Sequence, residues 1–263
     1  GTVHTCAILG TGHVKCWGHA YGGRLGDGGV HYTSTNNYRG DDAGEMGDNL
    51  AVVDLGTGAV AIGLSIMWGY SCVLLSNGSV KCWGSSSSHG ELGYGQGVTY
   101  GNNADRMGDN LPAVDLGSGM AATAVSAGSQ HTCVLLATKQ VKCWGDGYQG
   151  RLGYGNSRGH TNMGDSLPSV DLGSGRTALA ISASFSHTCA VLDTGDVTCW
   201  GQGQYGRLGY GHTDNVGDDA DEMGDHLHIV DLGTGVSATA VSAGWFHTCA
   251  LLATNEIKCW GLN

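Results

Sequence analysis

The sequence is poor in several residue types. It has only two prolines, two phenylalanines and 12 basic residues among 263 positions, and its formal net charge is −11. A nucleic-acid-binding surface needs clustered lysine and arginine to neutralise phosphates, so a nucleic-acid partner is not expected. No apolar run reaches the roughly 18 residues that would span a bilayer, so we expect no membrane insertion. No basic start followed by an apolar stretch marks a secretory signal, and we expect a soluble chain whose leader, where it had one, is already removed.

Glycine, by contrast, is abundant, with 48 residues, and 41% of the chain is hydrophobic. Glycine adopts the left-handed backbone conformations of tight turns and weakens helices. This composition therefore predicts many short strands joined by tight turns, around a substantial core.

The ten cysteines fall into five pairs, and the members of each pair are ten positions apart. Each pair encloses two apolar runs around a turn, as in "CVLLSNGSVKC", which predicts a β-hairpin. The residue after the midpoint is glycine or asparagine in four of the five copies, and Lys139 is the exception. Such a hairpin sets its two cysteines directly opposite each other, at a distance suited to a disulfide. The predicted disulfides join Cys6 to Cys16, Cys72 to Cys82, Cys133 to Cys143, Cys189 to Cys199 and Cys249 to Cys259.

A second block, "GRLGYG" followed by "MGDNLPAVDLGSG" and a small-residue strand such as "ATAVSAG", recurs between the hairpins. Four short strands in a repeat of about 60 residues are typical of a β-propeller blade. We therefore expect one all-β repeat domain over residues 1–263, with hairpins at 4–18, 70–84, 131–145, 187–201 and 247–261.

The motif "SAGSQHTCVLL…VKCWG…GYQGRLGYG" resembles the repeat of the regulator of chromosome condensation family, and the resemblance covers essentially the whole chain. It implies a β-propeller, usually with seven blades to a ring. Members of that family range from nucleotide exchange factors for small GTPases to secreted binding and inhibitor proteins, so the fold does not fix the function.

Five hairpins but only four connecting blocks are present. We expect either five disulfide-stapled blades with incomplete terminal blades, or a fragment of a larger ring. Open strand edges readily pair with other strands. The terminal blades are therefore expected to meet and share a blade, or to associate with another copy of the chain.

Regular disulfides indicate an oxidising compartment, which would be extracellular, periplasmic or the lumen of the secretory pathway. The repeated "HTC" also places histidines beside the cysteines, but closely spaced ligand pairs are absent and the spacing favours disulfides over zinc. We expect these histidines to hydrogen-bond backbone near the propeller axis, with Tyr70 in the same place in the second repeat. They are His4, His131, His187 and His247.

A tryptophan follows the second cysteine of every hairpin, which predicts packing between blades rather than a sugar-binding row. Trp68 and Trp245 fall outside this register and are the candidates for exposed contacts. The arginines of the "GRLG" turns are expected to brace the carboxylates of "VDLG", although Glu91 replaces arginine once.

The segments between "GRLG" and "MGD" vary in length, and such insertions commonly form the binding face of a propeller. Two of them are acidic and offer the hard oxygen ligands that calcium prefers, although their spacing fits no known calcium loop and a solvated acidic loop is the alternative. The candidate ligands are Asp41, Asp42 and Glu45 in the first segment, and Asp218, Asp219, Asp221 and Glu222 in the second. No other cofactor is expected.

Asn77 begins an N-glycosylation sequon at a hairpin tip, where asparagine followed by glycine is also a favoured turn. The sequence contains no nucleophile elbow, phosphate-binding glycine loop or zinc-protease motif. It therefore favours a non-enzymatic extracellular propeller that binds a protein or a glycan, or that assembles with other copies. The alternatives are a secreted hydrolase or lyase with an axial site, and a guanine nucleotide exchange factor, which the disulfides argue against.

Overall fold

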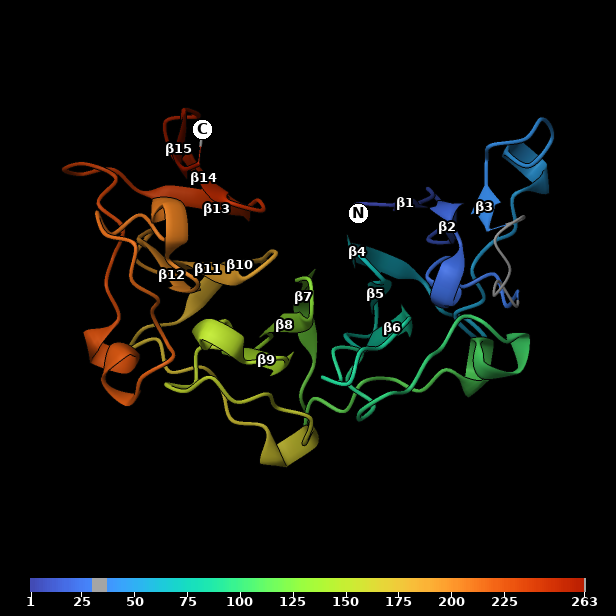
Figure 1. The fold of residues 1–263 in the computed structure, drawn as a ribbon, viewed down its shortest axis with the longest axis horizontal. Coiled ribbons are helices and arrows are strands. Elements are labelled where there is room, and N and C mark those ends of the chain that lie inside the picture. The colour runs from blue at the N-terminus through green and yellow to red at the C-terminus, as the bar shows by residue number, and fades with distance from the viewer. Residues whose placement is uncertain (30–36, 263) are drawn as a thin grey trace.

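The computed structural model describes residues 1–29 and 37–262 and arranges them as five small antiparallel sheets in an open arc (Figure 1). We call these sheets blades 1 to 5. Their strands are β1 (His4–Ile8), β2 (Val14–His19) and β3 (Tyr38–Arg39) in blade 1; β4 (Ala61–Met67), β5 (Tyr70–Leu75) and β6 (Val80–Gly84) in blade 2; β7 (Ala122–Ala127), β8 (His131–Leu136) and β9 (Val141–Gly145) in blade 3; β10 (Ala178–Ala183), β11 (His187–Leu192) and β12 (Val197–Gly201) in blade 4; and β13 (Ala238–Ala243), β14 (His247–Leu252) and β15 (Ile257–Gly261) in blade 5.

The helices among the described residues are single 3₁₀ turns of three residues, and none of them is long enough to cross a membrane. They lie in the connections between hairpins and inner strands. They are η1 (Tyr21–Gly23), η2 (Gly47–Asn49), η3 (Ala104–Arg106), η4 (Gly108–Asn110), η5 (Tyr148–Gly150), η6 (Gly164–Ser166), η7 (Gln204–Gly206), η8 (Ala220–Glu222) and η9 (Gly224–His226).

The predicted hairpins are present in every blade. In blade 2, Leu75 N–H donates to Ser79 O and Gly78 N–H donates to Leu75 O, which closes a three-residue loop with Gly78 at φ +82°. Lys139 adopts the same left-handed conformation, with φ +64°, although its side chain disfavours it. Each cysteine lies opposite its partner, so the five predicted disulfides are confirmed: Cys6–Cys16, Cys72–Cys82, Cys133–Cys143, Cys189–Cys199 and Cys249–Cys259.

The small-residue strands β4, β7, β10 and β13 form the inner edge of the arc (Figure 1). Neighbouring inner strands contact each other, β4 with β7, β7 with β10 and β10 with β13, because alanine and serine side chains allow strands to converge toward an axis. The tryptophans that follow the second hairpin cysteine fill the space between blades, and Trp83, Trp144 and Trp200 are fully buried. Packing between blades, as predicted for this tryptophan row, therefore builds the core.

The expected fourth strand is mostly missing. Blade 1 has a two-residue β3, and blades 2 to 4 have only single bridges, in which Gly84, Gly145 and Gly201 pair with Tyr100, His160 and Val216. The connecting segments then turn into 3₁₀ helices, because their glycine, asparagine and aspartate residues favour turns over an extended ladder.

The arc does not close, and its two ends face each other across a gap (Figure 1). Among the described residues, β1 has no strand on its inner edge, and the outer face of blade 5 has no blade against it. Leu251 and Ile257 on that face are 38% and 68% exposed, whereas the equivalent Val191 and Val197 of blade 4 are fully buried. The terminal blades are thus incomplete, and they do not share a blade.

Candidate functional site

A repeated hydrogen-bond network locks each blade to the next near the axis. His187 Nε2 of blade 4 lies 2.8 Å from Thr248 Oγ1 of blade 5, and Thr248 Oγ1 donates to the carbonyl of Arg207 at 2.8 Å. Because the hydroxyl proton is used on that carbonyl, the hydroxyl accepts the proton of His187 Nε2. The same arrangement links His131 to Thr188.

Blade 1 makes this contact through His4 and Ser71, at 2.9 Å. In blade 2, Tyr70 takes the histidine position and bonds to Thr132 Oγ1 at 3.0 Å. Tyr70 also bonds to backbone as expected, since its hydroxyl lies 2.9 Å from Gly128 O and 2.6 Å from His131 O. His247 is exposed. For His4, His131 and His187 the expected partner was wrong, because they bond to hydroxyls of the next blade rather than to backbone.

Burial keeps these histidines neutral. It lowers the pKa of His4 and of His187 to about 3, and it lowers the pKa of His131 well below its ordinary value. Nearby Arg207 and His247 lower the pKa of His187 further, because they are positively charged or able to become so. Every cysteine is held in a disulfide, so no thiolate is free to bind zinc beside these histidines.

The same end of the blades carries an exposed aromatic surface. The residue two positions before the hairpin histidine or tyrosine is Trp68, Ser129, Phe185 or Trp245 in blades 2 to 5. Trp68 and Trp245 are 49% and 40% exposed, as predicted, and their rings stack with centroids 6.2 Å apart. Phe185 packs against Trp245 with ring centroids 5.5 Å apart. We call Trp68, Phe185 and Trp245, together with Tyr21 of blade 1, the aromatic axial face.

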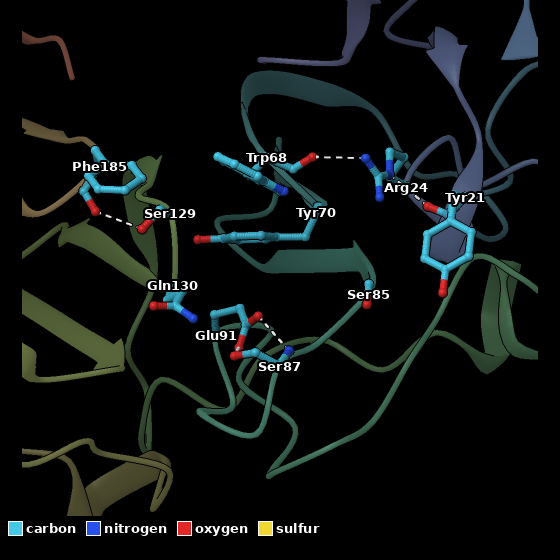
Figure 2. Close-up of a pocket in the computed structure, with 11 residues that line it drawn as sticks. Tyr21, Arg24, Trp68, Tyr70, Ser85, Ser87, Glu91, Ser129, Gln130 and Phe185 are labelled. Carbon is cyan, nitrogen blue, oxygen red and sulfur yellow. Dashed lines mark hydrogen bonds between the residues drawn. The ribbon is translucent and has the colours of Figure 1, made fainter.

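A cavity of about 480 Å³ opens on this face between blades 1 to 4 (Figure 2). Trp68, Tyr21 and Phe185 contribute aromatic rings to its lining. Its polar lining includes Arg24, Ser85, Ser87, Glu91, Ser129 and Gln130. Three of the variable segments follow a "GRLG" or "GELG" turn and then pass the glycine that ends β6, β9 or β12, with which each makes a single bridge.

Glu91 departs from the repeat in this cavity, because the equivalent residue of the other three turns is an arginine. The contacts of these arginines show what the repeat normally places there. Arg24 donates from Nε to Tyr21 O and from Nη1 to Trp68 O, which ties the turn of blade 1 to the axial loop of blade 2. The expectation that these arginines brace the "VDLG" carboxylates was wrong: Arg24 bonds to carbonyls, and the carboxylates of Asp54 and Asp171 accept from backbone N–H groups of their own turns. Arg151 does pair with a carboxylate, but it is Asp146 of its own turn, at 3.5 Å.

The acidic segments are organised around their own backbone. Glu222 Oε2 accepts from the N–H groups of Gly217, Asp218 and Asp219 at 2.8 to 3.1 Å, and Glu45 Oε2 accepts from Gly40 N at 2.7 Å. The second segment, including Asp221, forms no group of converging carboxylates among the described residues.

In the first segment, carboxylate oxygens of Asp41, Asp42 and Glu45 lie within 4.8 Å of one another. Asp41 and Asp42 are exposed. Calcium binding there stays a prediction.

Asn77 lies exposed at the tip of the blade 2 hairpin. Its Oδ1 accepts from Ser79 N at 3.0 Å and from Ser79 Oγ at 2.7 Å, so the side chain organises the turn. Glycosylation of Asn77 stays a prediction.

Sequence reasoning missed Phe185, Gln130 and the role of Glu91. An alignment of the residues two positions before each hairpin histidine would have revealed the aromatic series. The cavity itself could not have been found in this way, because its residues come from four blades and its shape depends on their packing.

Fold and site together define a disulfide-stapled β-propeller arc with an aromatic axial face and a mixed polar and aromatic cavity. The chain is similar to the regulator of chromosome condensation (RCC1) repeat family, whose repeat model matches residues 122–151, 179–207 and 238–263. The repeat model thus matches segments of three of the five blades.

Known relatives agree with this similarity. The chain is 27% identical over 266 residues to the mouse E3 ubiquitin-protein ligase HERC2, covering 99% of this chain and 5% of that protein. It is 28% identical over 140 residues to the Arabidopsis ultraviolet-B receptor UVR8, covering 53% of this chain and 29% of the receptor. Yeast RCC1 (Prp20), solved with Kap60 bound, superposes with a TM-score of 0.69 at 19% identity, over 98% of this chain and 54% of that chain. The chain thus spans only part of the length of these proteins.

Proposed function

We propose that the chain is an extracellular, non-enzymatic propeller that binds a protein through its aromatic axial face. The observation that supports this proposal is that residues that differ from the repeat lie around the same cavity. Tyr70 replaces histidine and Glu91 replaces arginine, and both line that cavity together with exposed Trp68. A residue that differs from the repeat in only one blade is not required by the blade structure and can contact a ligand, whereas residues repeated in every blade maintain the scaffold.

Exposed aromatic rings support protein recognition, since tryptophan and tyrosine supply much of the binding energy of protein interfaces. Yeast RCC1, of the same fold, was solved with a protein bound. The five disulfides support the extracellular setting, because a reducing cytosol would not maintain them.

The alternative of a secreted enzyme would require ionisable groups that are available to a substrate. Among the described charged residues that line the cavity, Arg24 is engaged with two backbone carbonyls, and Glu91 is the only carboxylate, so no second carboxylate is present to share acid and base roles with it. This lining favours a binding role over proton transfer.

The test is selection of peptides from a displayed random library against the immobilised, oxidised chain. We expect the enriched peptides to bind the original chain and to lose most of their affinity for Trp68→Ala and Trp245→Ala. Ile62→Ala is the control, because Ile62 is a similarly exposed apolar residue, 59%, at the opposite end of β4 from Trp68.

Peptides that bind both tryptophan variants as well as the original chain would show that the aromatic axial face is not the contact surface. A glycan array probed with the same proteins tests whether the partner is a glycan instead. If no peptide is enriched and the chain binds selected glycans that Trp68→Ala no longer binds, the partner is a glycan and not a protein.

Assembly with a second copy is a second candidate function, and the exposed face of blade 5 favours it. His247 occupies the position of His187 but is exposed, and Thr5 occupies the position of Thr248 and is also exposed. Blade 1 of another copy would therefore offer the hydroxyl that His247 lacks, and would cover Leu251 and Ile257.

Sedimentation velocity tests this assembly. We expect concentration-dependent association that Ile257→Glu abolishes and that the control Ile62→Glu retains, since Ile62 is 59% exposed on another blade. A monomer at all concentrations would refute it.

A further inference from the structure

The junction between blades 2 and 3 lacks the arginine brace found at two other junctions, those of blades 1 and 2 and of blades 4 and 5. Arg207 of blade 4 donates from Nε to Gln204 O and from Nη1 to Trp245 O, as Arg24 does to Tyr21 O and Trp68 O. At these two junctions a guanidinium connects the turn of one blade with the axial loop of the next.

Glu91 stands at the equivalent position of blade 2, and an ionised carboxylate has no proton to donate to the loop of blade 3. It turns instead toward its own loop, where it accepts from Ser87 N and Ser87 Oγ. Figure 2 shows Glu91 and Ser87 on one side of the cavity and Trp68 on the other. No guanidinium from blade 2 is therefore available at this junction, where the cavity lies.

Glu91 is also a buried carboxyl group without an ion-pair partner among the described residues. It is only 3% exposed, and no ion pair found within residues 1–29 and 37–262 includes it. Burying an unpaired carboxylate is costly, and hydrogen bonds from Ser87 offset only part of that cost. A cation that entered the cavity would offset more of it.

We propose that this cavity receives an arginine side chain of the protein partner, with its guanidinium facing Glu91. The inference rests on the proposed protein-binding function and names the chemistry that the site recognises. A partner's guanidinium would replace the one that the repeat supplies elsewhere.

Three features favour this ligand. A guanidinium is planar and stacks on aromatic faces such as that of Trp68, and it pairs with a carboxylate through two parallel hydrogen bonds. The net charge of −11 attracts cationic segments over longer distances. Arg24, the other charged group of the lining, directs Nε and Nη1 at the carbonyls of Tyr21 and Trp68, so Glu91 is the group in the lining that can accept from a cationic ligand through a carboxylate.

The experiment titrates the whole oxidised chain with a capped Gly-Gly-Arg-Gly-Gly peptide at 150 mM salt, followed by NMR chemical shifts of the tryptophan indoles. Peptides with lysine or with citrulline in place of arginine are titrated in parallel. Citrulline has nearly the shape of arginine but no charge. We expect it to bind about tenfold more weakly or worse, because a charge-assisted pair is worth at least that factor.

Glu91→Gln keeps the shape of the side chain and removes the charge, so it should abolish the preference for arginine over citrulline. Glu91→Arg restores the residue found in the other blades and should block the peptide without lowering the melting temperature. Glu256→Gln, an exposed change of equal charge on blade 5, should leave binding unchanged. It controls for general attraction to an acidic protein.

Equal binding of the arginine and citrulline peptides, or an unchanged preference in Glu91→Gln, would overturn the inference. Stronger binding of the lysine peptide would also overturn it, in favour of an ammonium ligand. The inference can fail while the proposed function holds. If selected peptides depend on Trp68 but not on Glu91, the aromatic axial face is still the protein-binding surface, and only the preference for arginine is refuted.

Discussion

Lowering the pH should loosen the junctions between blades, and His187 allows the effect to be measured. Its side chain is fully buried and bonds to Thr248, and burial holds its pKa near 3 in the folded chain. In the unfolded chain its pKa returns to about 6.5. The folded state therefore excludes a proton that the unfolded state binds.

The direction of the effect follows from this difference. Above pH 6.5, His187 is neutral in both states and the junction contributes fully to stability. As the pH falls below 6.5, only the unfolded chain takes up the proton, so stability declines until the folded pKa of about 3 is reached. At pH 5 this single group lowers the free energy of unfolding by about 2 kcal/mol relative to pH 7.5.

The assay is urea unfolding of the oxidised chain, followed by tryptophan fluorescence, at pH 7.5 and at pH 5. His187→Gln removes the titrating group. The loss of stability between the two pH values should therefore be about 2 kcal/mol smaller in this variant than in the original chain.

His13→Gln is the control for loss of a histidine, because His13 is exposed at the hairpin tip of blade 1, away from the junction of His187 with Thr248. It should leave the pH dependence unchanged. If His187→Gln and the original chain lose the same stability on acidification, the buried neutral histidine does not govern the junction.

Three further predictions concern the scaffold. Thr248→Val should lower the free energy of unfolding, measured with urea, by about 1–3 kcal/mol, because it leaves the buried Nε2–H of His187 unpaired. Thr5→Val, at the exposed equivalent position, should change that free energy little. Reduction of the disulfides should lower the melting temperature sharply in calorimetry, since each ten-residue loop contributes about 2.7 kcal/mol on a chain-entropy estimate; an unchanged melting temperature would contradict this. Expression in a eukaryotic secretory host should add a glycan to Asn77, visible as a mass shift that a glycosidase or Asn77→Gln removes.

Local patterns predicted the hairpins well because their determinants lie within a few residues. Two apolar runs around a turn, with cysteines ten positions apart, leave one register in which the sulfurs face each other, and the structure has that register in all five copies. The fourth strand failed as a prediction for a related reason. Its segments recur in every repeat, but their glycine and aspartate residues favour turns over strand pairing.

Contacts between blades were predicted less well. His187 and Thr248 are 61 residues apart, and the pattern "HTC" shows neither that they meet nor that the carbonyl of Arg207 joins them. The substitution of Glu91 for arginine was visible in the sequence, but its meaning depends on the guanidinium contacts at the other junctions.

The sequence by itself determined the all-β repeat, the five hairpins, their disulfides and the exposure of Trp68 and Trp245, because each depends on spacing along one short segment. Tertiary structure alone decided that the arc stays open, that hydroxyls lock its blades together, and that Glu91 lies buried and unpaired in a cavity beneath aromatic rings. These features arise where side chains from different blades converge near the axis, and the distances between such residues are set by the packing of whole blades.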